Sequence, residues 1–113
     1  MSWVHEFWSR GGLVGLGADS GYLQSLYGFA LIREMELMQQ AGIHPLDVVR
    51  IATTNSARIM GLDEDLCGIR FGCVADLIVV DGNPLENFKL LYGGGFAYFD
   101  TQREGEVFDA RHY

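Results

Sequence analysis

The hydrophobic pattern of this chain changes near Met60, and that change constrains the fold more than any other feature of the sequence. Before it, over residues 28–41, apolar side chains recur every three residues and form one stripe of a helix, namely Phe29, Ile32, Met35 and Met38. After it, residues 77–80 form an aliphatic, mostly β-branched run between two aspartates, which is typical of a strand. The sequence therefore predicts an α/β arrangement followed by a tail of strands, with the join near residues 62–67.

Start and stop signals divide the two parts further. Residues 2–10 are predicted as a short helix, and the helix over 28–41 ends at Gly42, a natural residue for the position after a helix. Pro45 suits the first position of the next helix. A third short helix is expected to run to Met60, capped by Thr53, Thr54 or Asn55. Two later strands are expected at 96–99 and 107–108, separated by a charged turn over 100–106.

The run Leu13-Val14-Gly15-Leu16 is short and fully apolar, which is typical of a strand buried on both faces of a parallel sheet. Asp19 follows it closely. A carboxylate at the carboxyl end of a parallel strand lies where α/β proteins place their sites, and there it could bind a metal or act as a general base. The alternative is an aspartate that only shapes a turn.

Length and charge exclude several classes. The 113 residues are enough for one domain with a core, whereas a complete (β/α)₈ barrel takes roughly 250. The net charge of −7 argues against nucleic acid or an anionic membrane as the partner. No apolar run reaches the about 18 residues of a membrane span, and no secretory signal is visible at the start, so we expect a cytoplasmic protein.

The remaining chemistry-bearing residues give weaker signals. Cys67 and Cys73 do not have zinc-site spacing, so we expect two reduced, half-buried thiols, with a hairpin disulfide as the alternative. The three histidines, His5, His44 and His112, are scattered and form no local ligand cluster. Residues 15–21 resemble a dinucleotide-binding fingerprint, but the third glycine comes one residue late, so a nucleotide-binding module is the least favoured function.

Four segments, in order, resemble the C-terminal part of metal-dependent amidohydrolases of the imidazolonepropionase-like and Xaa-Pro-dipeptidase-like kind. Residues 15–20 (GLGADS) resemble the last barrel strand and its G-[TA]-D-S ending. Residues 33–47 (REMELMQQAGIHPLD) resemble the family's helix pair, and residues 52–58 (ATTNSAR) its A-T-x-N-x-A-[RE] segment. Residues 68–85 (GIRFGCVADLIVVDGNPL) resemble its G-x-I-x-x-G-x-x-A-D-L segment.

The resemblance implies a C-terminal fragment of a (β/α)₈ TIM-like barrel, followed by strands of a small β-sandwich. Residues 1–62 would supply the last strand with its covering helices, and residues 63–113 the sandwich portion. Asp76 would then be buried and bonded to backbone amides at a tight turn. The family's other metal ligands lie on strands that this sequence lacks, and the tail after Tyr92 matches no family segment.

The resemblance also implies a function for Asp19. That carboxylate would be a metal ligand and the general acid/base in a hydrolase for C–N bonds of amides, cyclic amides or dipeptides, with a metal-bound hydroxide as nucleophile. A divalent metal, with zinc expected, and a small-molecule substrate would belong to the full-length parent enzyme. The isolated chain is expected to be inactive, because a catalytic zinc site usually needs three protein ligands. The alternative is a non-catalytic, self-associating module, and a homo-oligomer is expected because the apolar faces need cover.

Overall fold

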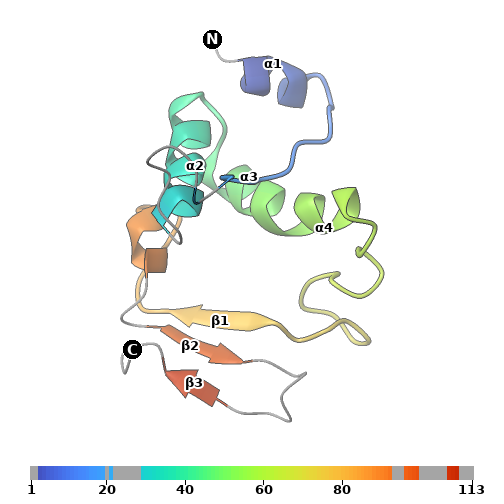
Figure 1. Cartoon of the computed structure of the whole chain (residues 1–113), viewed down its shortest axis with the longest axis vertical. Helices are drawn as coiled ribbons and strands as arrows, with labels where there is room; N and C mark the ends of the chain where they lie inside the picture. The colour runs from blue at the N-terminus through green and yellow to red at the C-terminus, as the bar shows by residue number, and fades with distance from the viewer. Residues whose placement is uncertain (1–2, 20, 22–28, 93–95, 100–106, 110–113) are drawn as a thin grey trace.

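The computed structural model describes residues 3–19, 21, 29–92, 96–99 and 107–109 of the chain. Figure 1 shows helices and strands in separate parts of the molecule, with the helices preceding most of the strands in sequence. The helices are α1 (Trp3–Ser9), α2 (Phe29–Gln40), α3 (Pro45–Arg50), η1 (Ile51–Asn55), α4 (Ser56–Ile59) and η2 (Phe88–Tyr92). The strands are β1 (Leu77–Val80), β2 (Phe96–Phe99) and β3 (Val107–Asp109). Within the described part of the chain, no helix has the length and apolarity needed to cross a membrane.

The turn between α2 and α3 forms as the sequence predicts. Gly42 has φ of 101°, a left-handed conformation that glycine adopts without steric cost. His44 is the N-cap residue of α3, and its Nδ1 accepts a hydrogen bond from the amide of Leu46 at 3.2 Å. Pro45 begins the helix and Asp47 lies in its first turn. His44 therefore has a structural role as a helix cap.

The separate third helix is a wrong prediction, because α3, η1 and α4 continue one another from Pro45 to Ile59. η1 is a turn of π-helix, and Asn55 has helical backbone angles with no side-chain capping bond. Thr53 bonds instead to the carbonyl of Val49, four residues back, at 2.7 Å. These polar side chains lie inside a continuous helix. Their preference for capping positions therefore led to a wrong prediction of a helix boundary.

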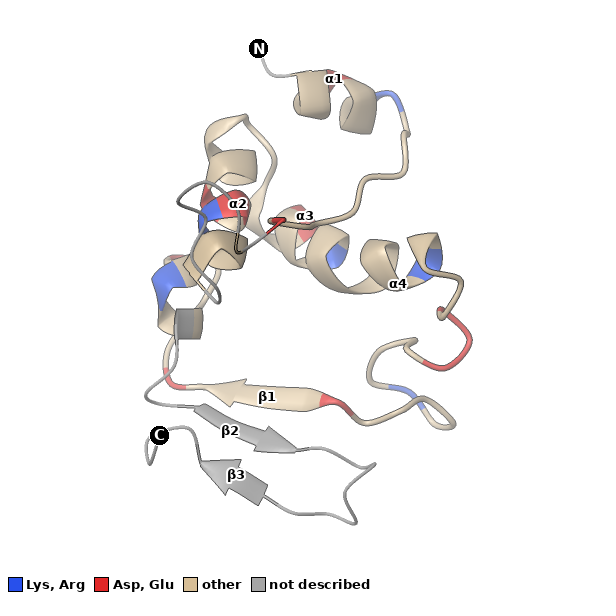
Figure 2. Ribbon diagram, in the orientation of Figure 1, with Lys and Arg blue, Asp and Glu red and all other residues tan. Residues whose placement is uncertain are grey.

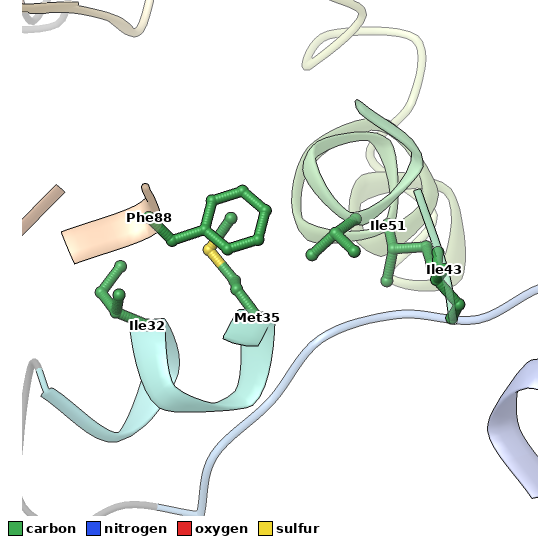
Figure 3. Close-up of a cluster of buried hydrophobic side chains, with 6 residues drawn as sticks. Ile32, Met35, Ile43, Ile51 and Phe88 are labelled. Carbon is green, nitrogen blue, oxygen red and sulfur yellow. The ribbon is translucent and has the colours of Figure 1, made fainter. Parts of the chain in front are cut away.

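The core lies among the helices. It consists of buried side chains from α2, from the turn after α2, from α3 and η1, and from η2. Figure 3 draws these residues: Ile32, Met35, Ile43, Val48, Ile51 and Phe88. The predicted stripe of α2 is confirmed at Ile32 and Met35, while Met38 packs at the edge of the core and Phe29 is exposed. Phe88 connects the segment after β1 to α2, and α2 and η2 are in contact.

The three strands form an antiparallel sheet in the order β1–β2–β3. Leu77 pairs with Phe99 and Val80 with Phe96, and Ala97 pairs with Asp109 in the second ladder. The predicted strands at 77–80, 96–99 and 107–108 are confirmed, whereas the predicted charged turn at 100–106 lies outside the described residues.

The predicted strand at 13–16 is not one. Residues 12–19 have no β-pairing, and the sheet of the described residues contains only β1, β2 and β3. Val14 and Leu16 pack at the edge of the helical core, and the amide of Leu16 donates to Oγ of Ser56 at 3.0 Å. An apolar run becomes a parallel strand only beside another strand. Here the run packs against a helix instead.

Cys67 and Cys73 form a disulfide, which corrects the expectation of two reduced thiols. Their Cα atoms lie 5.5 Å apart, within the range that a disulfide bridges. The turn between them brings them together: Arg70 donates to the carbonyl of Cys67 through Nε and Nη2, at 3.1 and 2.8 Å. The amide of Cys73 donates in turn to the carbonyl of Arg70 at 3.2 Å.

Candidate functional site

Asp19 is the last residue of the segment 12–19, which has neither helix nor strand, and it is exposed to solvent. Its φ is 47°, and it is the non-glycine residue of the described part of the chain with a positive φ. Aspartate tolerates this left-handed conformation better than most residues, because its short side chain can bond locally. The carboxylate of Asp19 thus follows a left-handed backbone position and is accessible to a solute.

Ser56 anchors the segment that leads to Asp19. Its hydroxyl accepts from the amide of Leu16 at 3.0 Å and donates to the carbonyl of Ile51 at 2.7 Å. The second bond spans five residues and belongs to the π-helical turn, so the turn and the segment share one side chain. Sequence reasoning missed Ser56, although it lies inside the segment 52–58 that carries part of the family resemblance.

Gly15 allows this close approach. A Cβ on Gly15 would lie 2.8 Å from Cδ1 of Ile59 and 3.3 Å from Oγ of Ser56. The first distance is shorter than real side chains tolerate, so a larger residue would push the segment away from the helix. Gly17, two residues further, has nothing within 4 Å of its Cβ position. The glycine nearer to the helix is therefore the one that fixes where Asp19 lies.

The described residues do not surround Asp19 with further ligands. Within the described ranges, no group of three or more His, Cys, Asp or Glu side chains is close enough to hold a metal ion. His44 is used as a helix cap, and His5 lies against Trp8, with 6.3 Å between the ring centroids. His112 lies outside the described residues. Asp19 is thus a single candidate carboxylate rather than part of an assembled centre.

Asp76 is exposed, which corrects the expectation of a buried, structural carboxylate. Before β1, the amide of Val74 donates to the backbone carbonyl of Asp65 at 2.9 Å, so this amide is satisfied by the backbone. The carboxylate instead borders a cavity.

That cavity, of about 480 Å³, lies between the rod formed by η1 and α4 and the first residues of β1. Its lining is mainly apolar and comes from segments distant in sequence, among them Thr54, Ala57, Met60, Leu66, Ile69 and Leu77. No sequence pattern indicated it, because it depends on how the helix and strand parts pack. The dinucleotide fingerprint, in contrast, is not supported: residues 15–19 contain no helix, where a binding motif needs a helix to begin at its glycines.

Comparison with known proteins assigns the family. The model of the Amidohydrolase family matches residues 4–103. Among solved structures, the putative prolidase from Bifidobacterium longum superposes with a TM-score of 0.71 and 27% sequence identity over 84% of this chain. The chain spans 23% of the length of that structure, and both similarities fit a fold derived from the TIM barrel. No curated protein matches the chain. A match over residues 4–103 covers most of the sequence, so this chain belongs to the amidohydrolase family.

Proposed function

We propose that this chain is the C-terminal part of a metal-dependent amidohydrolase that hydrolyses the C–N bond of an amide, a cyclic amide or a dipeptide. The family match across residues 4–103 carries the proposal. Residues 1–62 would supply the last part of the barrel and the helices that cover it. Residues 63–113 would belong to a small β-sandwich, to which β1 contributes.

Asp19 is the residue we assign to the chemistry. Its exposed carboxylate can accept a proton from water and return one to a leaving nitrogen, which is the role of a general acid/base. Amidohydrolases are generally metal-dependent, and zinc is the metal we propose. Within the described residues, Asp19 has no further metal ligands beside it, so these residues do not fit a complete metal site.

The test starts from the DNA upstream of Met1, where we expect an in-frame barrel that carries an H-x-H pair. The extended product should hydrolyse N-acyl amino acids, dipeptides or cyclic amides. Asp19→Asn should lower kcat by about 10²–10⁴, the usual contribution of general acid/base catalysis. Asp63→Asn, at an exposed carboxylate between α4 and β1, is the matched control and should leave kcat unchanged. Turnover by the 113-residue chain alone, or an active Asp19→Asn extended product, would contradict the proposal.

The second candidate function is a non-catalytic module that associates with itself. The observation that favours it is exposed aromatic surface: Trp3 is 89% exposed, and Phe7 and Phe29 are each more than half exposed. Such surface is costly in water and is usually covered by a partner. Sedimentation equilibrium distinguishes the candidates, because a stable homo-oligomer supports the module and a folded 12.6 kDa monomer contradicts it.

We also propose a cytoplasmic location. Fractionation of cells that make the protein should recover it in the cytoplasmic fraction. Recovery in a membrane or secreted fraction would contradict this proposal.

A further inference from the structure

One hydroxyl group connects the rod formed by η1 and α4 to the segment that carries Asp19. Oγ of Ser56 donates to the carbonyl of Ile51 at 2.7 Å and accepts from the amide of Leu16 at 3.0 Å. A hydroxyl has one proton to donate and two lone pairs that accept. Because the proton is used at Ile51, the orientation of the hydroxyl is fixed and a lone pair remains for the amide of Leu16.

The π-helical turn of η1 makes this arrangement of Ser56 possible. The backbone amide of Ser56 also donates to the carbonyl of Ile51, so the amide and the hydroxyl of one residue bind the same oxygen. In a regular α-helix that amide would bond to the carbonyl four residues back, which is that of Ala52. The wider turn therefore brings the Ile51 carbonyl within reach of the hydroxyl. Single π-helical turns inside helices occur frequently at functional sites.

The anchored residue, Leu16, lies close to Asp19 along the chain. Three residue steps separate the two, so their Cα atoms lie at most about 11 Å apart. Residues 11–18 carry no charge, and Asp19 is the first charged residue after Arg10 (Figure 2). The ion pairs of the described residues do not include Asp19. The position of its carboxylate therefore depends on how the backbone of the segment is held.

A general acid/base needs close placement. It must come within hydrogen-bond reach of the proton that it transfers, and a misplacement of about 1 Å can cost about 10²-fold in rate. Val14 and Leu16 hold the segment against the core by packing, which is not directional. The bond to Ser56 is directional, so it also fixes the register of the segment along the helix.

We propose that Ser56 is a positioning residue for the reaction of Asp19, oriented by the π-helical turn at Ile51–Asn55. This inference rests on the proposed function, because Ser56 acts only through the Asp19 carboxylate. Ser56 holds the amide of Leu16, and with it the chain that leads to Asp19. The property that matters is a hydroxyl that accepts a hydrogen bond, so threonine can replace the serine and alanine cannot.

The first experiment measures the anchor in the 113-residue chain by NMR. Ser56→Ala should speed hydrogen exchange at the Leu16 amide at least about tenfold and lower the order parameter of the Asp19 amide, because the acceptor is lost. Ser56→Thr keeps a hydroxyl and should preserve both values. The matched control is Thr53→Ala, which removes a hydroxyl of the same turn that bonds to Val49 and not to the segment, and it should change neither value.

Two further points keep this experiment decisive. Circular dichroism checks that each variant is folded. Ser56→Cys keeps the size of the side chain but offers only a weak acceptor, and it should change both values in the same direction as Ser56→Ala if the alanine variant does not fold. Unchanged exchange at Leu16 in the alanine or cysteine variant, or equal acceleration in Thr53→Ala, would overturn the proposal.

The second experiment is a double-mutant cycle in the extended product. Ser56→Ala should lower kcat about 10–100-fold and change KM by less than about threefold, because the carboxylate is displaced while the rest of the substrate site remains. In the Asp19→Asn background, Ser56→Ala should lower kcat by less than about threefold more, since the carboxylate through which it acts is already gone. Ser56→Thr and Thr53→Ala should both keep kcat near that of the unmodified product.

The outcomes separate this inference from the proposed function. If the extended product does not hydrolyse C–N bonds, or if Asp19→Asn leaves kcat unchanged, the proposed function is wrong and this inference fails with it. If Asp19→Asn lowers kcat but Ser56→Ala does not, or if Ser56→Ala lowers kcat equally in both backgrounds, only the positioning role is overturned. The first of these results is also expected if a neighbouring strand of the longer protein takes over the amide of Leu16.

Discussion

The helical part of the chain, residues 29–59, and the loop-and-strand part, residues 62–80, differ sharply in how much apolar surface they bury. The helical part contributes most of the buried core, including Val48 and Ile51, which are completely inaccessible to solvent. Between residues 62 and 80 no side chain is buried. Ile69 and Phe71 are almost fully exposed there, and Ile78 is 52% exposed.

This difference shows that the two parts are held by different forces. Side-chain packing holds the helices, with the segment of residues 12–19 laid against them. Backbone pairing and a disulfide hold the loop and the strands, which leaves apolar side chains of β1 accessible along a cavity. A part stabilised in this way can accept a partner without first breaking a core.

The strongest test of the difference between the helical part and the strand part is a pair of matched side-chain truncations. Ile51→Ala removes a fully buried side chain from the core and should lower the free energy of unfolding by about 2–5 kcal/mol. Ile78→Ala removes the same atoms from a half-exposed position and should cost less than about 1 kcal/mol. Urea denaturation followed by circular dichroism measures both. Equal losses would show that the strand part contributes a core of its own.

The next largest effect is expected from the disulfide. Closing a short loop stabilises a folded chain by roughly 2–3 kcal/mol in the chain-entropy account. Cys67→Ser together with Cys73→Ser should lower stability by that amount and should expose residues 67–73 to proteases while leaving the helices protected. Limited proteolysis with mass spectrometry reads out both regions. Cleavage that begins within α2 would show that the loop supports the helices as well.

The sequence predicts well what depends on local physics. Helix period, the glycine after α2, Pro45 at the start of α3 and the β-branched run of β1 each involve a few adjacent residues, and all of them are confirmed. The errors concern distant partners. Residues 13–16 have the composition of a buried strand, yet their neighbour is Ser56, forty residues away. Asp76 was expected to be a buried structural carboxylate, yet it is exposed and borders a cavity formed with a distant helix.

The candidate site shows the same division. Asp19 could be chosen from the apolar run before it, and the family resemblance gave it a role. The anchoring hydroxyl of Ser56 and the cavity beside β1 could not be chosen, because they exist only once a helix and a distant segment are packed together.

The smallest effect concerns the contact that places Asp19. Gly15→Ala puts a methyl group 2.8 Å from Cδ1 of Ile59, and we expect it to cost roughly 1–2 kcal/mol as the segment moves off the helix. Gly17→Ala is the matched control, because its Cβ position is open and its φ is not left-handed; it should be neutral or stabilise the chain by up to about 1 kcal/mol. Hydrogen exchange at the Leu16 amide, which bonds to Ser56, separates the two variants. Faster exchange in Gly15→Ala alone would confirm that this close approach holds the segment, whereas equal exchange in both would show that Ser56 holds it without help from the glycine.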